Sequence, residues 1–417
     1  MTSAEPPSRR RRAWLALALG IPILLFLLVT GSEPWVPPAR AATAEQVALA
    51  QDAYLALRSD RPEGEPVSLR LEQAQLGAIT ALISQGFAPN RLAAELEGDT
   101  LAIAASRPLL FRWLNMRALI RGESEGFPEI EARVGAIPVP SWLARDMLEL
   151  VLGRSTRAAE FPPLDELVRS VSIARDSATL SVDLPPSGLL DRLSGAPMID
   201  DRMVAAIYCA LAKRQREQPE PLFANQLQRA LHLTRPVPEQ HGAALVALAM
   251  IAVAPEAGDL TGEAAESVRE CAIAPVALTL QGRPDSPKHW ALSAALEVTT
   301  GTRFTAAIGE WKELADGLSR NPLLGPNDPS GFSFVDLATD RAGFLTARNL
   351  TDPKYLESTR ARLLKADDNV LLPPATLGLT DGMPNVEFVE LYGATDDPRF
   401  ERKIAEIDAM LRRGGIE

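Results

Sequence analysis

An uncharged apolar run near the N-terminus constrains this chain more than any other feature. Residues 13–30 carry no charged side chain, and Arg9 to Arg12 stand directly before them. About 18 such residues in a helix just span the hydrocarbon core of a bilayer. Because a basic cluster stays on the cytoplasmic side, the chain after residue 30 is expected on the opposite side. The sequence therefore predicts a single transmembrane anchor over 13–30, preceded by a cytoplasmic basic tail over 1–12.

A cleaved signal peptide is the competing interpretation of the same segment. Ala39-Arg40-Ala41 matches a cleavage site, but it lies far from the apolar run, which is also long for a signal peptide. We favour the uncleaved anchor, with the proline-rich residues 31–44 as a linker along the membrane surface. Either interpretation predicts a bacterial envelope protein, single-pass in the inner membrane, with residues 45–417 in the periplasm.

Charge and cysteine content restrict the partners and the covalent structure. The net charge of −11 argues against nucleic acid as a partner, since phosphate neutralisation needs a basic surface. Cys209 and Cys271 are too few for a disulfide scaffold. An oxidising compartment permits one bridge between them, but both lie in apolar helical sequence, where buried free thiols are common. Free thiols are the favoured interpretation and one bridge is the alternative.

Residues 45–195 are predicted to form an α+β domain with a curved antiparallel sheet and helices. Alternating apolar and polar residues indicate strands, and Gly98-Asp99 is a hairpin turn signal. The predicted strands are 67–71, 91–96, 100–106, 113–121, 129–134, 168–175 and 178–184, and the predicted helices are 46–57, 72–84 and one reaching about residue 152. These meandering strands, followed by R-V-G-A-I-P-V-P-S-W-L over 133–143, resemble small envelope domains in which a sheet wraps around a helix. Some of those domains bind lipids, although a closed apolar core is the favoured interpretation here.

Residues 196–417 are predicted to form an all-α domain. Predicted helices include 202–216, 222–231 and 240–253, of which the last is almost wholly apolar. A run of that length is too short to span a bilayer, so it is expected to be a buried core helix. Asp352-Pro353 and Asp397-Pro398 each predict a helix start, because aspartate caps and proline suits the first turn.

The segment Asp285–Gly343 holds the densest set of polar side chains at helical spacing. Asp285 or Ser286 can cap a helix that places His289 and Ser293 one turn apart on one face. Glu310 and Glu313 share a face of a second helix. Ser333 and Asp336 have the spacing of a reciprocal cap, and Asp340 follows Asp336 by one turn.

This segment resembles the YfiM-like family of predicted periplasmic lipoproteins. The matching residues are Asp285, His289, Ser293-Ala294, Gly309, Lys312-Glu313-Leu314, Asp316, Ser330-Gly331-Phe332-Ser333, Asp336-Leu337, Asp340 and Gly343. The family reads D-K-x-Q-H-F-x-x-S, then G-x-x-K-E-x-x-D, then S-G-x-S-x-x-D-x-x-x-D-x-x-G, and it has no established activity. Lys288 stands where the family has glutamine, the second loop is longer, and no lipobox cysteine precedes the domain, so lipid modification is not implied.

The candidate site is the cluster of His289, Glu310, Glu313, Asp336 and Asp340. A structural network is the favoured interpretation, because buried carboxylates are tolerated when paired, here with Lys312, Arg341 or His289. A metal site in the helical bundle is the second interpretation, although one histidine is few for a transition metal. Acid–base hydrolysis is the third, with His289 or a glutamate as the base. Contact with a partner through this surface is the last.

The sequence thus predicts a membrane-anchored periplasmic protein with a structural or interaction role in the cell envelope. The alternatives are a hydrolase or metal-dependent enzyme acting on an envelope component through the cluster, and lipid or apolar-ligand binding by the α+β domain. The expected partners are the inner membrane, through residues 13–30, and an envelope protein or lipid.

Overall fold

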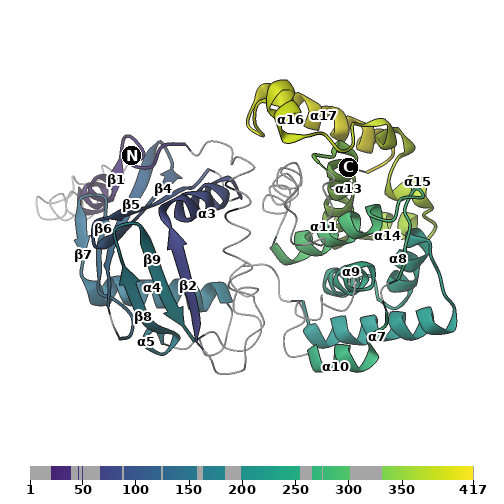
Figure 1. The fold of residues 1–417 in the computed structure, drawn as a ribbon, viewed down its shortest axis with the longest axis horizontal. Coiled ribbons are helices and arrows are strands. Elements are labelled where there is room, and N and C mark those ends of the chain that lie inside the picture. Colours follow the sequence, from purple (N-terminus) through teal and green to yellow (C-terminus); the bar gives the residue numbers. More distant parts are fainter. Residues whose placement is uncertain are drawn as a thin grey trace, which may run out of the picture. The chain divides into compact units, whose positions relative to one another are not determined.

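The chain is a mixed α+β protein, with antiparallel sheets in its first half and mostly helices in its second (Figure 1). The computed structural model describes residues 20–38, 46, 49, 66–86, 89–123, 125–156, 163–183, 199–253, 265–274, 276–300 and 331–416. It divides into two compact units. Unit 1 comprises residues 1–39, 68–149 and 163–182, and unit 2 comprises residues 40–67, 150–162 and 183–417. The predicted helix 46–57 lies almost wholly outside the described residues.

The main sheet of unit 1 is an antiparallel meander in the order β3-β4-β5-β6-β7, with the short strand β1 paired to β5. Its strands are β1 (Thr30–Gly31), β3 (Arg91–Glu97), β4 (Thr100–Leu109), β5 (Arg112–Arg121), β6 (Ile130–Val134) and β7 (Ile137–Val139). Gly98 adopts a φ of 69° in the turn between β3 and β4, which confirms the predicted hairpin. The alternating pattern was sufficient for β3 to β7 because each of these strands pairs with the next one in sequence.

A second sheet has the order β2-β9-β8, formed by β2 (Val67–Glu72), β8 (Val168–Ile173) and β9 (Ser177–Val182). The helices of this half are α3 (Gln73–Gly86), α4 (Ser141–Thr156) and α5 (Leu164–Leu167). Helix α3 is tied to the main sheet, because the Ser84 hydroxyl accepts from Leu92 N at 2.8 Å and Gln73 Nε2 donates to Ala94 O at 3.2 Å.

Unit 2 is built around α9 (Pro238–Val253), whose residues from His241 to Ala252 are all buried. This confirms the predicted core helix. The other elements of the second half are α7 (Asp201–Glu217), α8 (Phe223–His232), α10 (Ala265–Cys271), α11 (Ser286–Thr300), α13 (Phe334–Thr351), α14 (Leu356–Leu363), α15 (Asp368–Leu371), the 3-10 helix η2 (Pro374–Gly378), α16 (Asn385–Tyr392) and α17 (Pro398–Arg413).

Two predictions for this half are wrong. Cys209 on α7 and Cys271 at the end of α10 form a disulfide with their Cα atoms 5.3 Å apart, so neither is the free thiol that was favoured. Helix α14 starts at Leu356 rather than at Pro353, because Asp352 ends α13 as its C-cap. Its side chain instead accepts from Lys354 N at 2.8 Å in the intervening turn.

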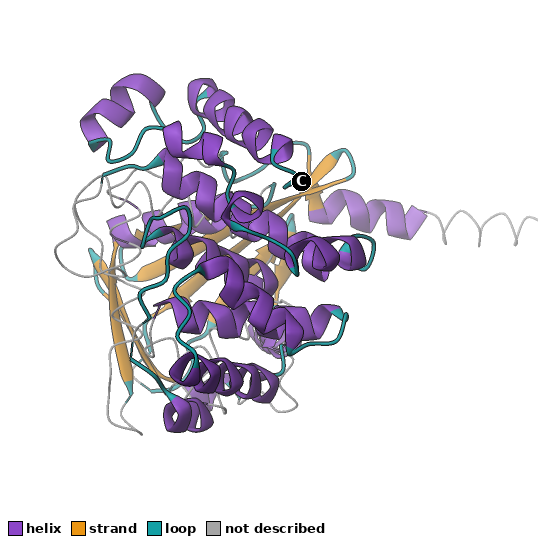
Figure 2. Cartoon of the chain, turned by 90° about the vertical axis from the view of Figure 1, so that its right-hand side faces the viewer, coloured by secondary structure: helices purple, strands orange, loops and turns teal. Residues whose placement is uncertain are grey.

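The described part of the predicted anchor is a short helix over residues 20–29, which projects from the edge of the main sheet (Figure 2). Its exposed apolar side chains are those of Ile21, Ile23, Leu24, Leu25, Leu27 and Leu28. Residues 1–19 lie outside the described chain, and within the described residues no helix is both long and apolar enough to cross a membrane. Residues 30–36, where the linker was predicted to begin, are bound to the sheet. Thr30 and Gly31 pair with β5, and Val36 is buried.

Candidate functional site: a buried polar cluster between two helices

The cluster lies where α11 crosses α13, and the crossing is close because small residues line it. Gly343 on α13 lies directly against the backbone of Trp290 on α11, so that an added Cβ would come 3.0 Å from Trp290 C. On α11, Ala291 and Ala294 are fully buried, as expected for alanines that permit close approach of helices. This contact fixes which faces of the two helices meet.

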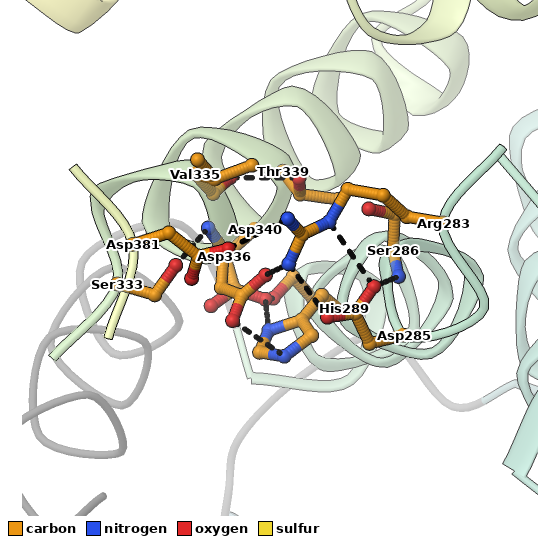
Figure 3. Close-up of polar contacts among 11 residues, drawn as sticks. Arg283, Asp285, Ser286, His289, Ser333, Val335, Asp336, Thr339, Asp340 and Asp381 are labelled. Carbon is orange, nitrogen blue, oxygen red and sulfur yellow. Dashed lines mark hydrogen bonds and ion pairs between the residues drawn. The ribbon is translucent and has the colours of Figure 1, made fainter. Parts of the chain in front are cut away.

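His289 lies between two aspartates of α13 (Figure 3). Its Nδ1 is 3.2 Å from Asp340 Oδ1, and its Nε2 is 3.6 Å from Asp336 Oδ2. Ser293, one turn further along α11, donates from its hydroxyl to the same Asp340 oxygen at 2.8 Å. All four side chains are buried. The spacing of four residues on each helix therefore produces one shared polar layer.

Arg283, in the turn before α11, closes the cluster on its other side (Figure 3). Its guanidinium donates to both carboxylate oxygens of Asp285, at 3.2 and 2.7 Å, and to Asp381 at 2.7 Å. It also lies 3.4 Å from Asp336 Oδ1. One cation thus serves three carboxylates, a geometry that the planar fork of arginine permits.

The electrostatics of this pairing hold the groups in their charged forms. Burial alone would lower the pKa of Arg283, but its hydrogen bonds with Asp285 and Asp381 outweigh burial and raise that pKa above its ordinary value. Burial likewise would raise the pKa of Asp285, yet the hydrogen bond and the charge of Arg283 leave it below its ordinary value of 3.8. The ion pair is therefore intact at neutral pH.

The cluster begins at two capped helix starts. Asp285 precedes α11, with its backbone carbonyl accepting from His289 N and its side chain accepting from Ser286 N at 2.9 Å. Ser333 is the N-cap of α13 and accepts from Asp336 N at 3.0 Å, as its spacing predicted. These caps fix the first turns, from which His289 and Asp336 project.

Few polar groups of the cluster are free to react with a substrate, and this limits the chemistry that the cluster can perform. Both nitrogens of His289 face carboxylates of α13, with Asp340 at 3.2 Å and Asp336 at 3.6 Å. A ring engaged in this way is not positioned to take a proton from a substrate. Asp340 Oδ2 differs, because it is buried and has no hydrogen-bond partner within the described chain. Across the described ranges, no group of three or more His, Cys, Asp or Glu side chains could hold a metal ion.

The structure brings together three of the five candidate residues: His289, Asp336 and Asp340. Glu310 and Glu313 lie outside the described residues. The three described candidates were found because helical periodicity places them on one face of each helix, and because the cap signals located both helix starts.

The expected cations need correction. Arg341 was expected to pair with the cluster, but it forms a bidentate ion pair with Asp408 of α17, at 2.6 and 2.8 Å. Lys312 lies outside the described residues. The described cation of the cluster is Arg283, which the sequence did not single out, although its position two residues before Asp285 was a local sign of their pairing.

The two other histidines lie apart from the cluster. His232 ends α8 and is exposed, as expected for a helix-end residue. His241 is fully buried in the first turn of α9, with Nδ1 3.2 Å from Leu350 O. Burial lowers the pKa of His241 below its ordinary value of 6.5, and the backbone hydrogen bond only partly opposes this.

Comparison with known proteins adds no assignment. The chain matches no protein-family model, no curated protein and no solved structure. The functional interpretation therefore rests on the residues and their geometry.

Proposed function

We propose that this chain is a membrane-anchored protein of the bacterial envelope with a structural or interaction role, and that its polar cluster is a structural network. The supporting observation is the mutual pairing of the cluster. Asp340 is bound by His289 and Ser293, and Asp336 lies between Arg283 and His289. Such a network orients two helices, and breaking one buried partner leaves the other uncompensated.

The proposed location has two supports. The helix over 20–29 exposes six large apolar side chains, which a bilayer would bury. The Cys209–Cys271 bridge is of a kind that persists in oxidising compartments such as the periplasm. A C-terminal alkaline phosphatase fusion should be active, and the full chain should stay in the membrane pellet after a carbonate wash. An inactive fusion or a chain released by the wash would contradict the location.

Two substitutions test the structural role of the cluster. Ser293→Ala and Asp340→Asn should each destabilise unit 2 by about 1–3 kcal/mol, because each leaves buried polar groups unpaired. Their effects should be less than additive, since Ser293→Ala removes the hydrogen bond from Ser293 to Asp340 and Asp340→Asn weakens the same bond by removing the charge of its acceptor. Lys354→Ala, which alters an exposed side chain of the same unit, is the control and should leave the melt unchanged.

A hydrolase is the second candidate because of one observation: Asp340 Oδ2, buried beside His289, has no hydrogen-bond partner among the described residues. Catalytic groups are often held in unfavourable surroundings, so replacing them often stabilises a protein. If Asp340→Asn raises the melting temperature instead of lowering it, the structural interpretation fails and hydrolase assays on envelope substrates become the next step.

A further inference from the structure

The turn between β4 and β5 exposes three consecutive large apolar residues. Leu110 is 84% exposed, Phe111 is 82% exposed and Leu109 is 38% exposed. Leu110 also has a φ of 56°, a conformation that suits glycine or asparagine much better than leucine. Burial of the Leu110 side chain within the described fold does not offset this backbone strain. A strained residue that gains nothing from packing indicates a functional role rather than a structural one.

This tip lies beside the apolar helix over residues 20–29. The rings of Phe26 and Phe111 meet edge to face with centroids 6.2 Å apart. Phe26 lies four residues before Thr30, where the helix ends and β1 begins. At a rise of 1.5 Å per residue, the tip therefore reaches about 6 Å back along the helix from its sheet-bound end.

The end of that helix is fixed to the sheet by three sets of contacts. Thr30 and Gly31 pair with Leu114 and Trp113 of β5. Arg112 donates to the Thr30 hydroxyl and carbonyl, both at 2.8 Å. Ala136 N, in the turn between β6 and β7, donates to Leu28 O at 2.8 Å. The position of the tip relative to the helix is therefore set by ordered hydrogen bonds.

The residues just behind the tip suit the boundary between lipid and water. Trp35 is half exposed and Arg107 is exposed. Tryptophan prefers the headgroup level of a bilayer, and an arginine can extend its charge to that level while its stem stays in apolar surroundings. An apolar tip with this polar and aromatic base matches the 5–10 Å depth to which interfacial elements enter a membrane.

We propose that the β4–β5 tip inserts into the periplasmic leaflet of the bilayer beside the anchor, and thereby holds the main sheet of unit 1 at the membrane surface. The occupant of this exposed surface is lipid, because the tip contacts the segment proposed as the membrane anchor. This inference rests on the anchor of the proposed function and adds a second insertion point.

Depth-dependent fluorescence quenching tests the proposal on the full chain in vesicles of phosphatidylcholine and phosphatidylglycerol. A polarity-sensitive NBD dye is attached at Leu110→Cys, and in a matched variant at Asp99→Cys. Asp99 lies in the turn at the other end of β4, which at about 3.3 Å per residue is roughly 36 Å away. Cys209 and Cys271 are bridged and do not compete for the dye without reductant.

The expected result is blue-shifted emission at position 110 and quenching by shallow doxyl-labelled lipid several-fold stronger than at position 99. A chain that survives the carbonate wash with a water-exposed dye at 110 overturns this inference and leaves the anchor standing. Blue-shifted emission without lipid quenching also overturns it, in favour of a protein partner or a second copy. Equal quenching at 110 and 99 overturns the proposal that the β4–β5 end of the sheet, rather than the opposite end, enters the bilayer. Release of the chain by the wash overturns the anchor itself.

Discussion

Replacing Gly343 with alanine would place a methyl group where the backbone of α11 already lies. The new Cβ would be 3.0 Å from Trp290 C and 3.1 Å from Trp290 Cα, and would overlap the Trp290 carbonyl oxygen. Carbon atoms pack at about 3.5–4.0 Å, so the two helices would have to separate by roughly 0.5–1 Å. Backbone atoms cannot rotate away as a flexible side chain can, so no local side-chain movement relieves the clash.

The magnitude follows from three effects. Overpacking of a tight core costs about 1–3 kcal/mol. Separation of the helices also weakens the 2.8 Å hydrogen bond from Ser293 to Asp340, and such bonds to charged groups contribute about 1.5–3 kcal/mol. Alanine returns about 1 kcal/mol through its higher helix propensity. The expected loss is about 1.5–5 kcal/mol, which for a unit of this size lowers the melting temperature by roughly 3–20 °C.

Differential scanning calorimetry of the full chain in detergent measures this loss. The transition of unit 2 is assigned by its shift on reduction, because the Cys209–Cys271 bridge lies in that unit. Gly242→Ala is the matched control: it adds the same methyl group in buried helix α9, but the nearest atom is the flexible end of Ile199 at 3.4 Å. If the Gly343→Ala protein has the same unit 2 melting temperature as the wild type, the close-approach argument is refuted. Equal losses in both variants would show that any buried methyl group is disfavoured.

Three further outcomes are expected. The His241→Gln variant should lose less unit 2 stability than the wild type when the pH falls below about 6.5, as measured by melts at a series of pH values. The reason is that the buried His241 ring stays neutral in the folded protein, while in the unfolded chain it takes up a proton. Gly135→Ala should release the helix over 20–29 from the sheet and speed hydrogen exchange of Thr30, because its Cβ would lie 2.8 Å from Val29 Cα. Reduction of the disulfide should destabilise unit 2 by about 4 kcal/mol in chemical denaturation, on the chain-entropy model for its sequence separation of 62.

Each of these outcomes has a contrary result. The lowered pKa of His241 fixes the direction of its pH effect. Its contribution to the stability of unit 2 is fully present above pH 6.5 and falls as the pH drops, so a gain of stability on acidification would contradict this prediction. Gly98→Ala is the control for Gly135→Ala, since Gly98 has a similar positive φ but open space around its added Cβ. Equal exchange in both variants would attribute the effect to backbone strain alone. Unchanged denaturation after reduction would mean that the bridge adds no stability.

The features predicted well from the sequence are those with a local cause. Helix α11 follows Asp285, helix α13 follows Ser333, and the β3–β4 hairpin turns at Gly98, each because a few adjacent residues fix the backbone. The failures involve distant partners. Arg283 meets Asp336 across 53 positions and Asp381 across 98, so its nearness in sequence to Asp285 did not show that it also serves these two carboxylates.

The disulfide and the cluster show the same dependence on packing. Cys209 and Cys271 lie in apolar sequence that suits free thiols equally well, and only the packing of α7 against α10 brings their Cα atoms within 5.3 Å. Neither helix alone carries a signal for the bridge, because the distance is a property of the pair.

The cluster was partly predictable because one residue marks where its helices cross. Gly343 permits the closest approach of α13 to Trp290, the residue beside His289. Asp340 lies three positions before Gly343 on the same face, so a crossing at this point forces Asp340 and His289 together. The sequence supplied the faces and the small residue, but not the identity of the opposing helix. Given that single pairing, the 3.2 Å contact of His289 with Asp340 follows from helix geometry.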